Sequence, residues 1–178
     1  PLLWFHVASA GELLQAQPVI SRCVAEGWQC VLTYSSINAL RWVERLGGVP
    51  EVLAVDFLPE DTSFNVRRLL GLIQPSGIVH VSYDLWPNLI WAARRHGAKV
   101  AVVNARLSDR SLRGYRRIKP LVGPLLRSVD LLAVQNRQYA ARFLQLGARS
   151  QTVHVTGSLK FDGAQTDRNN PVTRRFAR

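Results

Sequence analysis

Short runs of Val, Leu and Ile alternate along this chain with longer stretches in which apolar residues recur every three or four positions. The short runs are typical of buried strands, and the longer stretches are typical of amphipathic helices. Because the two kinds alternate, the pattern predicts an α/β fold, a parallel sheet with helices on both faces. The predicted strands are Leu2–Val7, Gln29–Tyr34, Glu51–Asp56, Gly77–Val81, Lys99–Asn104, Leu131–Gln135 and Gln151–Thr156. The predicted helices are Gly11–Glu26, Ser36–Leu46, Glu60–Ile73, Pro87–His96, Ser111–Arg127 and Arg137–Leu146.

Residues 1–162 are predicted to form one domain, since 178 residues of which 47% are apolar can bury one core. Residues 163–178 lose the periodicity and are predicted to be a linker. The chain has no Met and starts at Pro1, so we expect a piece of a longer polypeptide. No apolar run reaches the ~18 residues that span a bilayer, so we expect this piece to be soluble or peripheral, any anchor lying outside it. Cys23 and Cys30 are interpreted as reduced core thiols of a cytosolic protein.

In a parallel sheet of this kind, ligands bind beyond the carboxyl ends of the strands, so the segments that follow strands are the ones to inspect. The first strand is followed by His6-Val7-Ala8-Ser9-Ala10-Gly11-Glu12, which lacks the glycine pattern of a dinucleotide site. Glu12 falls in the first turn of the next helix, where the helix end favours its ionised form. Glu12 is a candidate general base; the alternative is a capping acid.

The fourth strand is followed by Ser82-Tyr83-Asp84-Leu85-Trp86-Pro87. Asp84 is a second candidate acid, and its alternative role is the N-cap of the next helix. Trp86 is predicted to be a large platform at the cleft. After the last strand, Gly157, Ser158 and Lys160 are able to contact a phosphate or a carboxylate, although no phosphate-binding glycine loop surrounds them.

The net charge of +11 arises from 20 Arg and 3 Lys against 12 acidic residues, and it is concentrated in one stretch. Between Arg94 and Arg127, ten Lys and Arg face a single acid, Asp109. Apolar residues interleave with them, which predicts one helix, or two divided at Pro120. Such a stretch suits anionic membrane lipid or a phosphorylated substrate; the alternative is a solvated basic face over a packing stripe. Nucleic-acid binding is not expected, because the recognised DNA- and RNA-binding motifs are absent from the sequence.

Five motifs, in order over nearly the whole chain, closely resemble the N-terminal half of Kdo (3-deoxy-D-manno-octulosonic acid) transferases of lipopolysaccharide synthesis. They are Ser9-Ala10-Gly11-Glu12, Leu85-Trp86-Pro87-Asn88, Asn104-Ala105-Arg106-Leu107-Ser108, Gly114-Tyr115-Arg116-Arg117 and Thr156-Gly157-Ser158-Leu159-Lys160-Phe161-Asp162. The resemblance implies a Rossmann-like domain that is the N-terminal, acceptor-side half of a GT-B glycosyltransferase. A C-terminal domain, absent from these residues, would hold most of the CMP-Kdo donor site.

The resemblance also implies roles for single residues. Glu12 would be the general base in an inverting reaction that needs no metal and no cofactor, with a lipid A precursor as acceptor. The protein would work at the cytoplasmic face of the bacterial inner membrane, peripheral or anchored by a segment outside this chain, and the isolated domain would be inactive. The residues implied to bind or support the acceptor are Ser9, Gly11, Asp84, Trp86, Asn104, Arg106, Tyr115 and Arg116. Those implied to contact an anion or the donor are Gly157, Ser158 and Lys160.

One motif departs from the family pattern. Family members usually carry Glu-x-Glu before Leu-Trp-Pro, whereas this chain has Ser82-Tyr83-Asp84. One carboxylate is lost and the other is shorter by a methylene, which places the donor sugar and the acceptor in doubt. An alternative function is therefore a catalytically degenerate domain that binds anionic lipid or glycan.

Overall fold

The computed structural model describes residues 1–45, 49, 51–82 and 85–161 of the 178. The strands are β1 (Leu2–Val7), β2 (Gln29–Tyr34), β3 (Ala54–Phe57), β4 (Gly77–Val81), β5 (Lys99–Ala105), β6 (Leu131–Val134) and β7 (Val153–Val155). The helices are α1 (Ala10–Ala25), α2 (Ile37–Arg45), α3 (Ser63–Ile73), α4 (Pro87–His96), α5 (Asp109–Arg117), α6 (Lys119–Arg127) and α7 (Arg137–Leu146). Two 3-10 turns, η1 (Ser150–Thr152) and η2 (Leu159–Phe161), flank β7.

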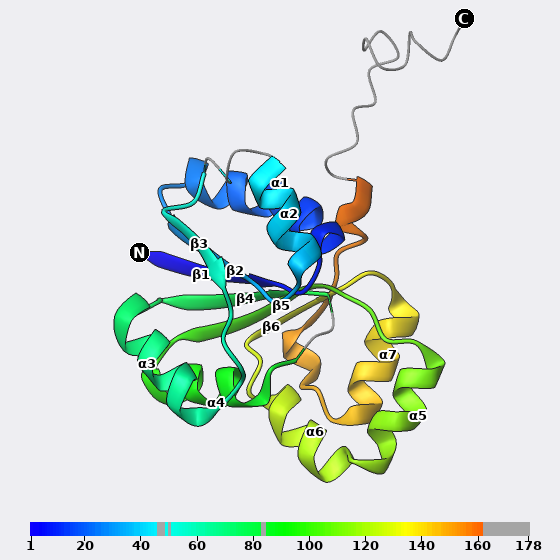
Figure 1. Ribbon diagram of the computed structural model, residues 1–178. Coiled ribbons are helices and arrows are strands. Elements are labelled where there is room, and N and C mark those ends of the chain that lie inside the picture. The colour runs from blue at the N-terminus through cyan, green and yellow to red at the C-terminus, as the bar shows by residue number, and fades with distance from the viewer. Residues whose placement is uncertain (46–48, 50, 83–84, 162–178) are drawn as a thin grey trace, which may run out of the picture.

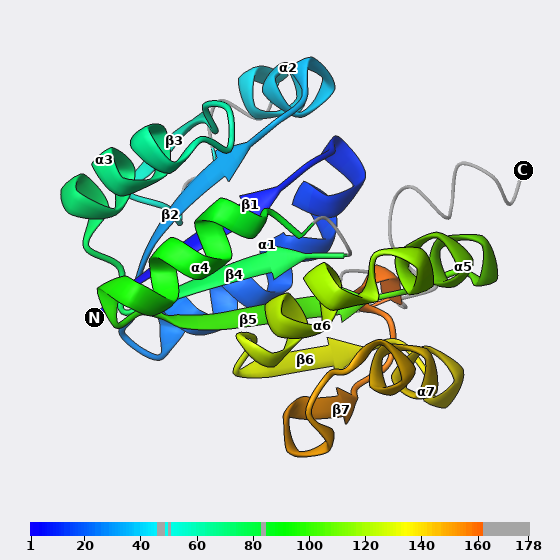
Figure 2. The same cartoon turned by 90° about the horizontal axis from the view of Figure 1, so that it is seen from below.

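All seven strands form one parallel sheet in the order β3-β2-β1-β4-β5-β6-β7. The chain moves outward from β1 to β3 and then returns to the other side of β1 with β4, so the winding direction reverses between β1 and β4. Helices α1 and α2 cover one face of the sheet, and α3 to α7 cover the other (Figures 1 and 2). The predicted parallel sheet with helices on both faces is confirmed.

Alternating side chains of the strands build a core on each face. Along β1, Phe5 and Val7 pack with Leu13 of α1, while Trp4 packs with Leu89 of α4 on the opposite side. All five side chains are fully buried. This period of two is the signature of a strand whose two faces are both covered by helices.

Three predicted boundaries are wrong in ways that local chemistry explains. The third strand begins at Ala54 rather than Glu51 and is a short, largely exposed edge strand. The basic stretch forms two helices, and the break lies at Ile118 rather than Pro120, because proline is tolerated in the first turn of α6. Helix α5 starts at Asp109, since the Ser108 hydroxyl accepts the Ser111 N–H and caps the helix.

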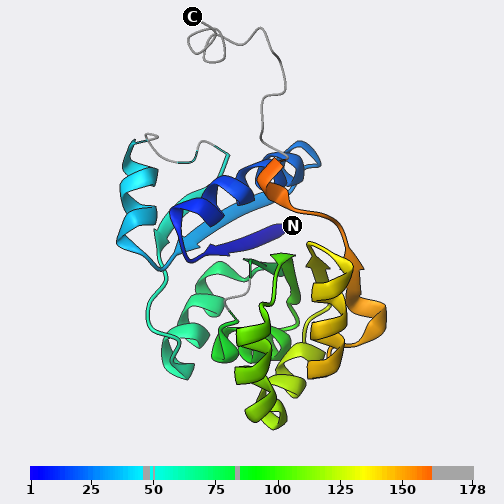
Figure 3. The same ribbon diagram turned by 90° about the vertical axis from the view of Figure 1, so that its right-hand side faces the viewer.

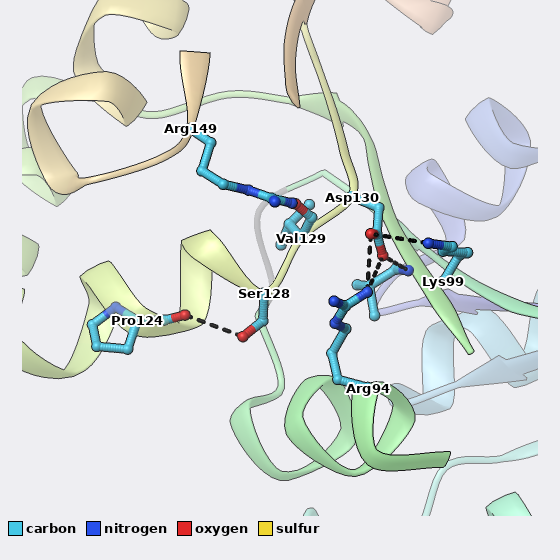
Figure 4. Close-up of polar contacts among 8 residues, drawn as sticks. Arg94, Lys99, Pro124, Ser128, Val129, Asp130 and Arg149 are labelled. Carbon is cyan, nitrogen blue, oxygen red and sulfur yellow. Dashed lines mark hydrogen bonds and ion pairs between the residues drawn. The ribbon is translucent and has the colours of Figure 1, made fainter. Parts of the chain in front are cut away.

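At the amino edge of the sheet, away from the candidate site, one carboxylate links several elements. Asp130, just before β6, accepts two hydrogen bonds of 2.9 Å from Arg94 of α4 and one of 2.9 Å from the Val100 backbone N–H. Lys99 lies 3.7 Å from the same carboxylate (Figure 4). Asp130 therefore ties α4 and β5 to the start of β6, and this ion cluster has a structural role.

Candidate active site at the carboxyl edge of the sheet

The carboxyl ends of the parallel strands meet along one edge of the sheet. Because the strand order reverses between β1 and β4, the connections that leave these two strands run to opposite sides. Open α/β sheets bind ligands at such a reversal point. The segments that leave β1, β4, β5 and β7 at this edge contain the residues predicted from sequence. The part of that edge between β1 and β4 is therefore the candidate active site.

Glu12 is held rigidly at this edge by the first turn of α1. Ser9 is the N-cap, and its hydroxyl accepts the Glu12 backbone N–H at 3.3 Å. The Glu12 carboxylate turns back and accepts the Ala8 backbone N–H at 2.7 Å. This exchange is a variant of the capping box formed by Ser and Glu three residues apart. These hydrogen bonds confirm the capping interpretation, and the general-base role of Glu12, which is 9% exposed, stays a prediction.

Gly11 lies between these two residues and is exposed. A Cβ at this position would meet only the Ser9 hydroxyl, at 4.0 Å, so nothing in the described chain requires glycine here. The predicted contact of Gly11 with an acceptor stays a prediction.

Asn104 is the polar centre of the site. Its amide Nδ2 donates to Gln15 of α1, and its Oδ1 accepts from the Gln135 side chain at 2.9 Å and from the Leu159 backbone N–H at 3.2 Å. Asn104 is only 3% exposed, so in the described structure it acts as a positioning residue, and its predicted part in binding or supporting the acceptor stays a prediction. The three partners join α1, the exit of β6 and η2 around the end of β5.

The segment after β7 is delivered to the same edge. Gly157 has φ +89°, a left-handed turn that glycine adopts without strain. The Ser158 hydroxyl accepts the Lys160 backbone N–H at 3.3 Å. η2 then packs against α1, as Figure 3 shows for the orange segment beside the blue helix. The structure thus brings the segment of Gly157, Ser158 and Lys160 to the helix that carries Glu12, with Lys160 exposed.

Two residues at this edge have left-handed backbones without being glycine. Ser82, directly after β4, has φ +74°, and Asn104 at the end of the neighbouring β5 has φ +55°. The two segments are joined by the Ser82 backbone N–H, which donates to the Val103 carbonyl at 2.8 Å. Strained backbones concentrate at functional sites. Ser82 is 2% exposed, so its hydroxyl is buried and is not presented at the surface of the site.

Trp86, predicted as a large platform at the cleft, packs against a buried histidine, and its role toward a ligand stays a prediction. It is half-buried and meets the His6 ring edge-on, with the ring centroids 5.4 Å apart. The His6 Nδ1 lies 3.0 Å from the Thr33 hydroxyl, and the His80 ring lies 6.0 Å from His6 by centroids. Trp86 packs onto this cluster because its indole is large and apolar, and its backbone is the N-cap of α4.

The helix α4 is capped by a residue that the sequence did not single out. Asp61, in the connection before α3, accepts the Asn88 and Leu89 backbone N–H groups at 3.0 Å each. The N-cap position itself is Trp86, so the alternative interpretation of Asp84 as the N-cap of α4 is wrong. Asp84, the candidate acid, lies outside the described residues. Asp61 lies in the first turn of the predicted helix Glu60–Ile73, so its sequence position does not indicate that it caps a different helix.

Burial makes the His6 and His80 pair a source of acid sensitivity. Burial lowers the pKa of His6 to about 4, against a smaller opposing effect of its hydrogen bond to Thr33. Burial and the neighbouring His6 lower the pKa of His80 to about 3. Below an unfolded pKa of about 6.5, the unfolded chain binds protons that the folded chain does not, so stability falls as the pH drops toward 4.

His80→Leu is expected to weaken this pH dependence. Between pH 6.5 and 4.5 the parent should lose about 2 kcal/mol more unfolding free energy than the variant, because one histidine no longer titrates on unfolding. Urea unfolding at the two pH values measures the difference. Leu fills the apolar site and removes two ring nitrogens that have no partner among the described residues. Equal losses in the two proteins would show that His80 does not titrate on unfolding.

Arg106 and the α5 residues lie on the part of the edge that follows β5. Arg106 is exposed and lines a cavity of about 220 Å³ with Ser108, Ser111 and Tyr139. Arg116 donates to Gln145 of α7 at 2.7 Å.

Tyr115, which precedes Arg116 in α5, packs against the core on the face of the sheet covered by α3 to α7. Arg116 and Tyr115 therefore hold α5 in place in the described structure, and their predicted contact with an acceptor remains untested.

Arg142 was missed by sequence reasoning, because an arginine inside an amphipathic helix is normally exposed. It is 7% exposed, donates to the Leu107 carbonyl, and pairs with Asp109 at 2.6 Å. Arg142 thereby holds the segment that carries Arg106 against α7.

In the described ranges no three His, Cys, Asp or Glu side chains lie close enough together to hold a metal ion. Nor does any helix of the described chain have the length and apolar content to cross a membrane.

Comparisons with known proteins add a family to this geometry. The family described as 3-Deoxy-D-manno-octulosonic-acid transferase (kdotransferase) matches residues 1–163. The 3-deoxy-D-manno-octulosonic acid transferase of Chlamydophila psittaci is 33% identical over 172 residues, which are 96% of this chain and 40% of the relative. The enzyme of the same name from Bordetella pertussis is 34% identical over 91% of the chain and 38% of its own length. The chain thus spans about two fifths of these relatives.

Solved structures agree on the fold at low sequence identity. A putative UDP-N-acetylglucosamine 2-epimerase from Listeria monocytogenes has a TM-score of 0.67 and 13% identity, over 99% of this chain and 51% of its own. MurG of Acinetobacter baumannii has a TM-score of 0.58 and 10% identity, over 89% of this chain and 46% of its own. At such identities the likeness shows the Rossmann-like fold and nothing of the ligands.

Proposed function

Because the chain belongs to the 3-deoxy-D-manno-octulosonic acid transferase family, we propose that it is the acceptor-side domain of a Kdo-type glycosyltransferase. The donor is a CMP-sugar, CMP-Kdo or a related sugar acid, bound mainly by a C-terminal domain that follows residues 163–178. The acceptor is a lipid A precursor in lipopolysaccharide synthesis. The reaction inverts the anomeric carbon and uses neither metal nor cofactor, and the isolated domain is inactive.

The observation that carries the proposal is the placement of Glu12. Its carboxylate lies at the N-terminus of α1 beside the reversal between β1 and β4, where the helix end stabilises negative charge. In the proposed step Glu12 takes the proton of the 6'-hydroxyl of the acceptor disaccharide. The hydroxyl oxygen then forms the bond to the anomeric carbon of Kdo, and the bond to CMP breaks with CMP leaving as the anion.

The remaining site residues support binding in this proposal. The segment of Gly157, Ser158 and Lys160 is held against α1 and offers the Lys160 cation to an anionic substrate. Arg106 offers a second cation from its cavity beside Ser108. The basic helices α5 and α6 place the protein at an anionic membrane, at the cytoplasmic face of the inner membrane, where an acylated, phosphorylated acceptor is found.

The transfer itself tests the proposal. The natural polypeptide that contains these 178 residues is incubated with CMP-Kdo and a lipid A precursor, with and without EDTA. We expect a glycosylated lipid and free CMP in equal amounts, unchanged by EDTA. Glycosylated lipid that forms only with added metal ions would contradict the metal-independent mechanism.

A second candidate function rests on Ser82. Because this residue stands where the resembled family pattern usually has a glutamate, the site has one carboxylate fewer than that pattern. A domain that binds anionic lipid or glycan without transfer is the alternative. Vesicle binding by the natural polypeptide, without product in the transfer assay, would favour it.

A further inference from the structure

The tertiary structure collects on one face of the sheet the helices that carry twelve of the 23 Lys and Arg residues. Helices α3 to α7 contain twelve Arg and Lys against a single acid, Asp109. Helices α1 and α2, on the opposite face, contain three Arg against two Glu. All five basic helices lie on the face that Figure 2 presents to the viewer. The positive surface therefore extends beyond the basic stretch that the sequence shows.

Helix α3 adds exposed apolar groups to this surface. Phe64 and Leu72 are 74% and 73% exposed, the highest fractions for large apolar side chains among the described residues. They share the outer face of α3 with Arg67 and Arg68, because positions three, four and eight apart fall on one side of a helix. We call these four residues the α3 ridge. At 1.5 Å per residue the ridge is about 12 Å long.

The α3 ridge borders two hollows with the same mixed character. A groove of about 230 Å³ between α3 and α4 is lined by Leu70, Gly71 and Ala92 together with the polar side chains of Arg67, Arg95 and His96. A depression of about 660 Å³ lies at the start of α3, beside Phe64 and Arg68. Both hollows combine apolar walls with guanidinium groups, which suits a phosphate headgroup together with hydrocarbon.

The charges of the ridge and groove are uncompensated within the described chain. Neither α3 nor α4 contains an acidic residue. The ion pairs of the described residues leave Arg67, Arg68 and Arg95 without an acidic partner. An exposed row of arginines flanked by Phe and Leu is typical of helices that lie in an anionic bilayer interface. Nucleic acid offers phosphates but no partner for the two projecting apolar groups.

We propose that the α3 ridge and the α3–α4 groove dock this protein on an anionic lipid bilayer, with Phe64 and Leu72 inserted among the lipids. Arg67, Arg68 and Arg95 bind the phosphate headgroups. This docking surface is separate from the α5–α6 stretch. The inference rests on the proposed function only for the statement that docking presents the site to a lipid acceptor. It places the carboxyl edge of the sheet beside the membrane from which that acceptor is taken.

Vesicle sedimentation tests the docking surface without using activity. The natural polypeptide is mixed with vesicles of phosphatidylglycerol and phosphatidylcholine, or of phosphatidylcholine alone. Binding is expected only with the anionic lipid. Arg67→Gln with Arg68→Gln should weaken that binding about tenfold, since each cation near an anionic surface contributes appreciably. Phe64→Ser with Leu72→Ser should weaken it about tenfold by removing buried apolar area.

Matched controls lie on the opposite face. Arg22→Gln with Arg41→Gln removes the same charge from α1 and α2, and Ile37→Ser removes an apolar group that is 65% exposed. Both control proteins should bind as the parent does. Equal weakening by the two arginine pairs, normal binding by the α3 variants, or no binding by the parent would overturn the docking surface.

The transfer assay separates this inference from the proposed function. With an acceptor dispersed in detergent, the α3 variants should transfer at the parental rate, because their substitutions lie away from Glu12. If the parent shows no transfer but its vesicle binding depends on the ridge, the function fails and the docking surface stands. If transfer occurs but vesicle binding ignores the ridge, the docking surface fails alone.

Discussion

Glu12→Gln should reduce the transfer rate of the natural polypeptide by about 100- to 10,000-fold, because general-base catalysis contributes that much. The same substitution should change the free energy of unfolding by less than about 1 kcal/mol. Glutamine is an accepted partner in a capping box, and its side-chain oxygen is able to accept the Ala8 N–H that Glu12 now accepts. The measurements are kcat with CMP-Kdo and a lipid A precursor, and urea unfolding of both proteins.

This variant separates the two roles of Glu12, which an alanine would remove together. Glu26→Gln is the matched control, since it takes the same charge from the other end of α1, where Glu26 pairs with the exposed Arg22. It should keep parental activity. If Glu12→Gln turns over within about threefold of the parent, Glu12 is a helix cap only and the proposed base is wrong. A loss of stability alone would lead to the same conclusion.

Asn104→Ala should lower the free energy of unfolding by about 3 kcal/mol, equivalent to a Tm lower by about 6–12 °C. Two contributions add. The substitution leaves Gln15, Gln135 and the Leu159 N–H without the Asn104 side chain, and buried polar groups that lose a partner are costly. It also places alanine at φ +55°, which asparagine tolerates better by about 1 kcal/mol.

Asn104→Gly separates these contributions, because glycine accepts the backbone angle while lacking the side chain. It should be less destabilising than alanine by about 1 kcal/mol, as judged by urea unfolding. Gln135→Ala, which removes one of the three bonds, should cost less than either. Equal stability of Asn104→Ala and the parent would show that the side-chain bonds carry no net free energy. Transfer should fall in Asn104→Ala, since the segment of Lys160 loses its attachment.

The order of elements could be predicted from the sequence because it depends on local patterns. The short apolar runs of β1 and β4, and the helical period of α1 and α7, are visible in short windows. The capping box at Ser9 and Glu12 is equally local, which is why a capping role was foreseen. Boundaries failed where exposure or proline position decided them, at β3 and at the break between α5 and α6.

The site was harder to predict than the fold, because its contacts join residues far apart along the chain. Asn104 was predicted to bind or support the acceptor, but its hydrogen-bond partners, which lie 89, 31 and 55 residues away, could not be foreseen. His6 and His80 meet because β1 and β4 pair in register. No window of the sequence contains such a pair. Arg142 and Asp61 were missed for the same reason.

By itself, the sequence determined an alternating α/β chain with an acidic first turn after β1, a family likeness and a large basic excess. These follow from periodicity, motifs and composition, which need no knowledge of distant neighbours. Only the tertiary structure decided what the excess charge does, because the strand order places α3 to α7 on one face. That placement adds Phe64, Arg67, Arg68 and Leu72 to the surface, and it gathers Glu12, Asn104 and the segment of Lys160 at one edge of the sheet.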